Sequence, residues 1–278
     1  MSALLERAGI DDATLASRSR RFGAWYVVEH KLRAVRAFFW TMIATALGSP
    51  FLYLFAFGVG LATLVSRNDA FLEQTGVGYL QFVAPALIIN AAVLVAAEEY
   101  MFGMLLGFKW NMIFIGMNAA PLSGRQIVDG MFLYVGIRGL FTAGIYYGAV
   151  ALFGGVVSPW AVLVIPIAIL TGLAFSPIAA YSASIYEDRG QFNIVNRLIV
   201  MPLSLFSGTV FPLSQLPIFL QWIGWISPIW HGSELARQFS YGPTEPFWLS
   251  LVHVAYLAAL AILGWRLTVH LTVKRLAR

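Results

Sequence analysis

The residues of this chain that could carry out chemistry are few, and they match no recognised catalytic pattern. The chain has no cysteine and no His-Glu-x-x-His sequence. It also lacks the phosphate-binding sequence Gly-x-x-x-x-Gly-Lys-Ser/Thr, since no glycine precedes a lysine. Zinc chemistry, a nucleophile activated by histidine and a P-loop for ATP therefore have no support, and we expect no cofactor in this chain. The four histidines are widely separated: His30, His231, His253 and His270.

Three carboxylates, Glu98, Glu99 and Asp129, are the remaining candidates for acid–base chemistry. An enzyme that acts on a lipid-linked substrate needs convergent carboxylates or histidines at one face of the membrane. An integral membrane enzyme, such as a transferase, is therefore kept as the alternative function. It requires these three side chains to meet at a common site.

Arg138 is a charge inside an apolar stretch, roughly 12–15 Å from its nearer end at 1.5 Å per residue. Such a charge costs about 2.5–3.5 kcal/mol to insert into a membrane, so it needs a partner or a wet cavity. Glu98 and Glu99 end the preceding apolar stretch and are candidate partners. Two roles stay open for Arg138: a structural ion pair, or contact with a phosphate or acidic headgroup on a translocation path. An ion-coupled transporter would show more such charges and an internal repeat, and the sequence has neither.

The elements that position these residues are helices in a membrane. Of the 278 residues, 59% are hydrophobic and 11% are charged, and the mean hydropathy is +0.77. Soluble domains carry about 25% charged residues, so this composition indicates an integral membrane protein. Six apolar stretches are long enough to cross a bilayer, which takes about 20 residues. They are residues 38–65, 77–97, 127–153, 160–186, 194–211 and 247–269.

The positive charges predict the orientation of these spans. With six spans, all Lys and Arg residues but three fall on one side; Arg67 and Arg237 lie on the other, and Arg138 lies within a span. The positive-inside rule then places both termini in the cytoplasm. The net charge of +5 is thus a topology signal and not a nucleic-acid-binding surface. The cytoplasmic set is Arg7, Arg18, Arg20, Arg21, Lys31, Arg33, Arg36, Lys109, Arg125, Arg189, Arg197, Arg266, Lys274, Arg275 and Arg278.

The stretch FSGTVFPLSQLP, residues 206–217, is too apolar for a surface loop, yet Gly208, Pro212 and Pro217 would break a membrane helix. Non-helical backbone persists at membrane depth only where protein or a water-filled cavity covers it. We therefore predict a re-entrant segment with a turn near Phe211 and Pro212, followed by short helices that enter from outside. The alternative is an external loop whose tryptophans form an aromatic belt.

The stretch HGSELARQ follows this segment and carries three polar side chains at three-residue spacing, His231, Glu234 and Arg237. That spacing places them on one face of a short helix. We expect this face to cap the re-entrant segment rather than to catalyse a reaction.

The first 36 residues form a cytoplasmic N-terminal segment, and residues 37–278 form the transmembrane domain. Within residues 21–36, Trp25 and Val28 belong to an apolar face, and Glu29 can pair with Arg33 at i,i+4. A basic helix with one apolar side is suited to the inner membrane interface, against lipid. It either anchors the N-terminus or acts as a lever between a cytosolic partner and the first span.

The loop between the second and third spans, residues 98–130, is too apolar for a solvated linker. An apolar cytoplasmic helix with polar interruptions requires a protein groove that buries it. The loop therefore contains either a docking helix or one more interfacial helix.

Three stretches resemble the membrane subunit of type-2 ABC exporters: GSPFLYLFAFGVGL at residues 48–61, NAAPLSGRQIVDG at 118–130, and FSGTVFPLSQLP with the following ISPIWHGSELAR. The resemblance covers the whole chain. It is nearest to permeases that export lipo-oligosaccharide nodulation factors and daunorubicin-type drugs, and it is weak on substrate. It implies an all-α integral membrane protein with six transmembrane helices, an N-terminal amphipathic interface helix and an extracellular re-entrant helical hairpin between spans five and six.

The resemblance further implies a permease subunit without an ATP-binding site of its own. Two such subunits, identical or paralogous, would pair in a bacterial plasma membrane, and two separate ATPase subunits would bind ATP and Mg beneath them. The cargo, a glycolipid, lipid-linked saccharide or hydrophobic drug, would move outward.

The family's functional positions map onto three groups of residues. The coupling helix at residues 108–118 predicts ATPase contacts for Lys109, Trp110, Asn111, Met112, Phe114 and Ile115. The interface helix contains Trp25, Glu29 and Arg33. The re-entrant segment and translocation path would include Ser207, Gly208, Phe211, Pro212 and Pro217, with Trp40, Tyr53 and Arg138; the aromatic residues among these are otherwise ordinary packing or lipid-facing residues.

Overall fold

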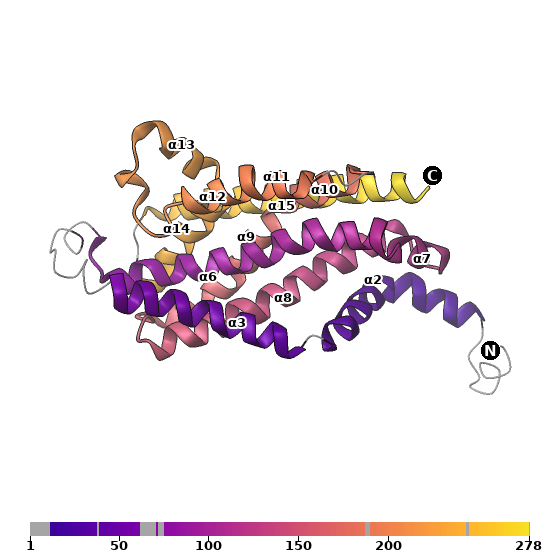
Figure 1. Cartoon of the computed structure of the whole chain (residues 1–278), viewed down its shortest axis with the longest axis horizontal. Helices are drawn as coiled ribbons and strands as arrows, with labels where there is room; N and C mark the ends of the chain where they lie inside the picture. Colours follow the sequence, from indigo (N-terminus) through magenta and orange to yellow (C-terminus); the bar gives the residue numbers. More distant parts are fainter. Residues whose placement is uncertain are drawn as a thin grey trace.

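The computed structural model describes residues 12–37, 39–61, 71, 75–186, 190–242 and 245–277. Every regular element in these ranges is a helix, and most helices run along one long axis (Figure 1). This agrees with the all-helical class predicted from the sequence. Four of the predicted topology charges, Arg7, Arg67, Arg189 and Arg278, lie outside the described residues.

Four helical segments in the described ranges are long and apolar enough to cross a membrane. They correspond to the second, third, fourth and sixth predicted spans, in agreement with an integral membrane protein. The first is Tyr79–Trp110, which joins α6 (Tyr79–Glu98) to the π-helical segments η2 (Glu99–Gly103) and η3 (Leu106–Trp110). The others are α8 (Gly124–Leu152); Pro159–Ser184, made of η4 (Pro159–Leu163), α9 (Val164–Ala174) and α10 (Pro177–Ser184); and α15 (Phe247–Leu276).

Residues 39–61 of the first predicted span and 194–205 of the fifth are helical but do not belong to this set. In the first, α3 (Phe39–Tyr53) continues into the π-helix η1 (Leu54–Leu61). In the fifth, the apolar part Phe192–Leu205 is about 21 Å long, which is short for a hydrocarbon core of about 30 Å. The count of six spans therefore stays a prediction. The elements of the fifth are α11 (Gln191–Val195), η5 (Asn196–Val200) and α12 (Met201–Leu205).

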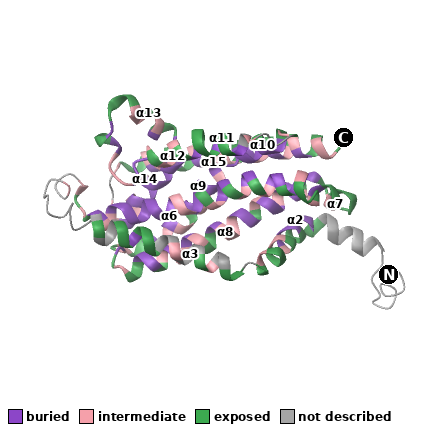
Figure 2. Ribbon diagram, viewed as in Figure 1, coloured by how far each residue is buried: buried purple, intermediate pink, exposed green. Residues whose placement is uncertain are grey.

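α6 is the central helix of the bundle. It packs against α8, α9 and α14 (Pro228–Tyr241). Buried residues run along α6 and α9, whereas α13 (Ile218–Ile226) and the described side chains of α3 are largely exposed (Figure 2). α6 is apolar on all sides, as expected for a helix that protein surrounds.

The two ends of the bundle carry different elements. α2 (Asp12–Arg36), α7 (Ile113–Ala119) and the C-terminal end of α15 lie at one end, and α13 lies at the other (Figure 1). We call these the α7 end and the α13 end. The predicted coupling residues and the FSGTVFPLSQLP segment are therefore at opposite ends of the bundle (Figure 1).

α2 begins before the predicted start at residue 21 and packs along α8. Its apolar residues are divided between two faces, which corrects the single apolar face predicted. Val27 is fully buried against protein, whereas Phe22 and Trp25 are about half exposed and are free to meet lipid. The predicted pair between Glu29 and Arg33 is confirmed, with 2.5 Å between Oε1 and Nη2.

A glycine allows this close approach of α2 to α8. A Cβ added to Gly130 would overlap the carbonyl oxygen of Ala24 and the side chain of Val27. Because one of these atoms belongs to the backbone, no rotamer change can relieve the overlap. The position thus determines how closely α2 docks.

We expect Gly130→Ala to destabilise the chain by about 1–3 kcal/mol, the usual cost of overpacking. The matched control is Gly144→Ala on the same helix, where an added Cβ meets nothing within 4 Å. Thermal unfolding of the purified full chain measures both variants. Equal midpoints for the two would contradict the described docking of α2.

Residues 98–110 continue the long α6 helix instead of forming a separate docking helix. Tyr100, Met104 and Phe108 in this stretch are buried, so protein and not solvent covers its apolar side. The predicted coupling helix at residues 108–118 is therefore divided among three elements. Lys109 and Trp110 end the long helix, Asn111 and Met112 form a bend, and Phe114 and Ile115 belong to α7.

The FSGTVFPLSQLP segment breaks the helix, as predicted, but earlier than expected. α12 ends at Leu205, and Gly208 takes the left-handed conformation (φ 70°) that glycine adopts readily after a helix end. The turn therefore precedes the predicted position at Phe211 and Pro212. The chain continues through η6 (Leu213–Gln215) into α13, which extends away from the bundle (Figure 1).

Candidate functional site

Exposed apolar side chains gather at the α7 end. Met112 takes a left-handed conformation (φ 51°, ψ 26°) and bends the chain between η3 and α7. Trp110, Met112 and Ile115 are 57%, 58% and 52% exposed, and Asn111 beside them is also exposed. We call these four residues the α7 surface. Large apolar side chains grouped in this way are typical of a surface that another protein covers.

Phe114 has the opposite orientation. It is 3% exposed, and its ring lies 5.1 Å from the ring of Phe108, nearly perpendicular to it, over Gly107. Phe114 therefore anchors α7 to the end of the long helix and is not available for contact with another protein. Lys109 is partly buried. Of the six predicted coupling residues, the four of the α7 surface face outward.

Arg138 belongs to an ion cluster that joins three helical elements. Lys31 of α2 donates to Glu99 at 2.9 Å, and Arg138 of α8 donates to the other carboxylate oxygen of Glu99 at 2.5 Å. Glu98 lies 3.8 Å from Arg138 and is largely exposed. The expected pairing of Arg138 with Glu98 and Glu99 is thus confirmed, and Lys31 is an additional member. We call Lys31, Glu99 and Arg138 the ion cluster.

A cavity of about 280 Å³ connects the ion cluster with the α7 end. Lys31 and Glu99 line one part of it, and Trp110 and Phe114 line another. Val27 and Val35 of α2 supply apolar wall. A displacement of α7 would therefore change the space that α2 and the ion cluster share.

Asp129 does not join the two glutamates. It accepts a hydrogen bond from Trp265 Nε1 at 2.7 Å and lies 3.6 Å from Arg125 Nε. Glu99 is occupied by two cations, so the three carboxylates do not form a shared acid–base site. No group of three or more metal-binding side chains occurs among the described residues. The three carboxylates on which the alternative membrane enzyme depends therefore do not meet at a common site.

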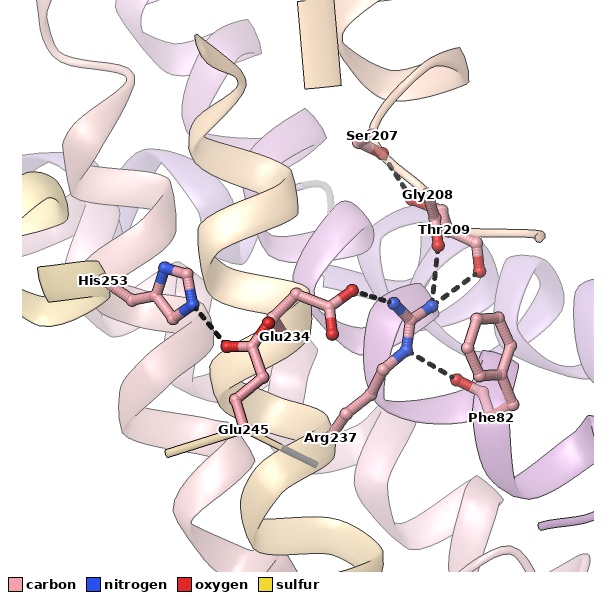
Figure 3. Close-up of polar contacts among 8 residues, drawn as sticks. All are labelled: Phe82, Ser207, Gly208, Thr209, Glu234, Arg237, Glu245 and His253. Atoms are coloured by element: carbon pink, nitrogen blue, oxygen red, sulfur yellow. Dashed lines mark hydrogen bonds and ion pairs between the residues drawn. The ribbon is translucent and has the colours of Figure 1, made fainter. Parts of the chain in front are cut away.

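At the α13 end, a buried arginine holds the FSGTVFPLSQLP turn. Arg237 is 1% exposed and pairs with Glu234 at 2.6 Å. Its guanidinium also donates to the carbonyl oxygens of Gly208 (2.7 Å), Thr209 (3.3 Å) and Phe82 (3.2 Å), and it lies 3.7 Å from the centre of the Phe82 ring (Figure 3). Arg237 of the predicted polar face thus contacts the turn, with Glu234 as its counter-ion, and the re-entrant path of the segment stays a prediction.

His231, on the same helix, belongs to a second buried chain of contacts. His231 Nδ1 lies 2.7 Å from His253 Nδ1, and His253 Nε2 lies 3.0 Å from Glu245 Oε2 (Figure 3 shows the latter contact). His231 Nε2 lies 3.0 Å from the carbonyl oxygen of Trp225. Burial and the neighbouring His253 lower the pKa of His231 to about 4. These contacts attach α14 to both α13 and α15.

A second cavity, of about 620 Å³, lies between α14 and the FSGTVFPLSQLP segment. Pro212 and Ser214 line it on the side of the segment, and Glu234 and Glu245 line it on the side of α14 and α15. Its walls combine these polar groups with apolar ones such as Phe82 and Leu213.

Residues 30–241, which contain the α7 surface, the ion cluster and the FSGTVFPLSQLP segment, match the family described as "ABC-2 type transporter". The chain belongs to the ABC-2 type transporter family. This confirms the resemblance to type-2 ABC permeases found in the sequence. The chain is a membrane permease of that family.

Curated relatives match along most of their length. Nodulation protein J of Rhizobium leguminosarum bv. viciae is 28% identical to this chain, and the match covers 84% of this chain and 86% of the relative. Nodulation protein J of Rhizobium meliloti (strain 1021) is 26% identical, and the match covers 85% of this chain and 89% of the relative. The inner membrane transport permease YadH of Escherichia coli (strain K12) is 27% identical, and the match covers 61% of this chain and 65% of the relative. No solved structure matches this chain.

Within one ABC-2 chain, the predicted path residues do not share a surface. Trp40 and Tyr53 are exposed on α3, which packs against α8. Ser207 is buried, donates to the carbonyl of Ser204 at 2.8 Å and contacts the Thr209 hydroxyl. It follows α12, which lies across the bundle from α3 (Figure 1). Arg138 faces the ion cluster. Their role on a path stays a prediction.

Three residues with clear structural roles were not singled out from the sequence: Lys31, Glu245 and Phe82. Lys31 had a local signal, because it follows Val27 by four residues and so shares its buried face. Glu245 and Phe82 had none, since their partners His253 and Arg237 lie on other elements.

Proposed function

We propose that this chain is the permease subunit of an ATP-driven exporter that moves an amphiphile outward across a bacterial plasma membrane. The observation that carries the proposal is the α7 surface, with Trp110, Met112 and Ile115 exposed at one end of an ABC-2 permease. A separate ATPase subunit covers this surface and binds ATP and Mg. The cargo class, a glycolipid, a lipid-linked saccharide or a hydrophobic drug, follows from the names of relatives that concern nodulation and from the resemblance.

The assembly contains two permease subunits, either two copies of this chain or this chain and a paralogue, above two ATPase subunits. Both termini and α7 face the cytoplasm, and the α13 end faces outward with the re-entrant segment. α3 and the fifth apolar segment complete six spans. The broad exposed apolar surface of α3 supports a further protein or lipid contact there.

Coupling runs from the α7 surface through Phe114 to the cavity beside the ion cluster. Nucleotide-driven closure of the ATPases displaces α7, and Phe114 transmits this to the long helix because it is buried against Phe108. α2 responds because Lys31 attaches it to Glu99. A bundle that shifts between two discrete packings gives alternating access.

The double variant Trp110→Ala with Ile115→Ala is expected to weaken binding of the ATPase by about 30-fold or more, as loss of a tryptophan hot spot of about 2 kcal/mol requires. Binding of the purified ATPase to the full chain in lipid nanodiscs measures the effect. The matched control is Trp160→Ala, which removes an equally exposed tryptophan from η4, a helix that packs on α14 at the α13 end. Equal binding by the two variants would remove the α7 surface from the proposal.

A further inference from the structure

The contacts of His231 and His253 fix the number of protons that the pair holds. The carbonyl oxygen of Trp225 only accepts hydrogen bonds, so His231 Nε2, 3.0 Å away, must carry a proton. An ionised Glu245 also only accepts, so His253 Nε2 must carry a proton as well. A neutral imidazole carries only one N–H, so in two neutral rings both Nδ1 atoms would be bare, that is, without a proton.

Two bare Nδ1 atoms cannot lie 2.7 Å apart, because their lone pairs would face each other. One further proton between them restores a hydrogen bond. The same count results if Glu245 is protonated: it then donates to His253 Nε2, and His253 Nδ1 donates to His231 Nδ1. The reference state is two neutral imidazoles with an ionised Glu245. Both arrangements add one proton to that state, and both satisfy all three contacts.

We propose that His231, His253 and Glu245 form a buried binding site for one proton, and that this proton attaches α14 to α15. The site is close to neutral when occupied, since the Glu245 carboxylate balances the shared positive charge. Its two imidazoles are enclosed, with His253 1% and His231 7% exposed, whereas Glu245 is 24% exposed and borders the second cavity. Loss of the proton would leave an uncompensated carboxylate and two opposed lone pairs, so one contact must break.

The surroundings hold this geometry in place. Gln238 of α14 bonds both the backbone N–H and the backbone carbonyl of Glu245 at 3.2 Å. The ring of Tyr256 stacks on His231 with centroids 4.1 Å apart, and its hydroxyl donates to the carbonyl of Ile226 at 2.6 Å. The rings therefore cannot turn away from each other without disturbing both neighbouring helices.

Among the residues that the structure describes, few other charges reach the site. α9, η4, α12 and α13 pack on α14 and contain no charged residue, and the charge of α6 is at its far end, at Glu98. On α14, Glu234 and Arg237 neutralise each other. Charged residues of α8 meet α15 at Trp265, about 18 Å along the helix from His253. The other titratable groups nearby are Tyr241 and Tyr256.

Burial and the neighbouring His253 lower the pKa of His231, which disfavours a second proton in the pair. The site therefore alternates between one proton and none. His231 and Arg237 occupy the same short helix, and Arg237 holds Gly208 and Thr209. Release of the proton thus loosens the helix that positions the FSGTVFPLSQLP turn.

The test is nitrogen-15 NMR of the histidine rings in the full chain, in lipid nanodiscs at pH 8, where a free imidazole of pKa about 6.5 is neutral. We expect a proton on His231 Nε2 and a proton between the two Nδ1 atoms. If either position is bare at pH 8, the proposal is wrong. His30 and His270, both exposed, are references in the same spectrum.

Two variants separate the site from a general effect of folding. Glu245→Gln keeps an acceptor for His253 but removes the balancing charge, so the pH at which the bridging proton leaves should fall by about one unit or more. His231→Asn places an amide that can donate to His253 Nδ1, so His253 should lose its extra proton. His270→Gln should change nothing. An unchanged titration in Glu245→Gln would overturn the assignment, and the wild-type spectrum decides it even if a variant does not fold.

Discussion

Replacing Arg237 by methionine is expected to lower the stability of the chain by about 3–5 kcal/mol, the cost of breaking a buried ion pair by removing one partner. Glu234 would keep its charge at 17% exposure without a counter-ion. The carbonyl oxygens of Gly208, Thr209 and Phe82 would lose a charged donor at the same time. Thermal unfolding of the detergent-solubilised full chain, followed by tryptophan fluorescence, measures the loss.

Graded variants identify which contact of Arg237 matters most. Glu234→Gln should cost less than Arg237→Met, because the guanidinium keeps its three carbonyl acceptors. Arg237→Lys should be intermediate, since an ammonium lacks the planar fork that serves several acceptors together. A midpoint for Arg237→Met equal to that of the wild type would show that Arg237 does not hold the FSGTVFPLSQLP turn.

Glu99→Ala is the second substitution with a large expected effect, about 3–5 kcal/mol, because it leaves two cations in the protein without a carboxylate. Lys31 and Arg138 are 16% and 17% exposed, so solvent replaces little of the lost interaction. α2 would lose its ionic attachment to the end of α6. Hydrogen–deuterium exchange should therefore rise in α2 before the rest of the bundle unfolds.

The matched control for Glu99→Ala is the neighbouring Glu98→Ala. Glu98 is 60% exposed and lies 3.8 Å from Arg138, so its removal should cost about 1 kcal/mol or less. Similar losses for the two glutamates would contradict the ion cluster as the attachment point of α2. Unchanged exchange in α2 of Glu99→Ala would do the same.

The sequence predicted the long helices well, because continuous apolar stretches of adequate length have few other structures. It failed at the end of the second span. The charges of Glu98, Glu99 and Lys109 ended the predicted span, but apolar side chains of residues 98–110, such as Tyr100 and Met104, are buried against protein. Composition does not distinguish burial by protein from burial by lipid, so the helix was ended too early.

The candidate site was predicted in its residues but not in their directions. Trp110 and Phe114 are both aromatic and four positions apart, yet one is exposed and the other is buried. The left-handed backbone of Met112 lies between them and breaks the helical spacing on which a face assignment depends. Methionine rarely adopts that conformation, so no sequence pattern indicates the bend.

Contacts between distant segments had no signal in the sequence. Arg237 reaches the carbonyl of Phe82, 155 positions away, and any residue could supply that acceptor. The three-residue spacing of His231, Glu234 and Arg237 predicted a polar face against the turn; Arg237 contacts the turn, whereas His231 contacts His253 and Trp225. The spacing did not predict which backbone atoms that face would bind.

The central claim is that this ABC-2 permease works with a separate ATPase through the α7 surface. Affinity purification of the tagged full chain from its own host in mild detergent, with ATP hydrolysis measured in the eluate, tests it most directly. We predict a P-loop ATPase in equal amount and hydrolysis that is lost in Trp110→Ala with Ile115→Ala but kept in Trp160→Ala. An eluate without an ATPase and without hydrolysis would contradict the account.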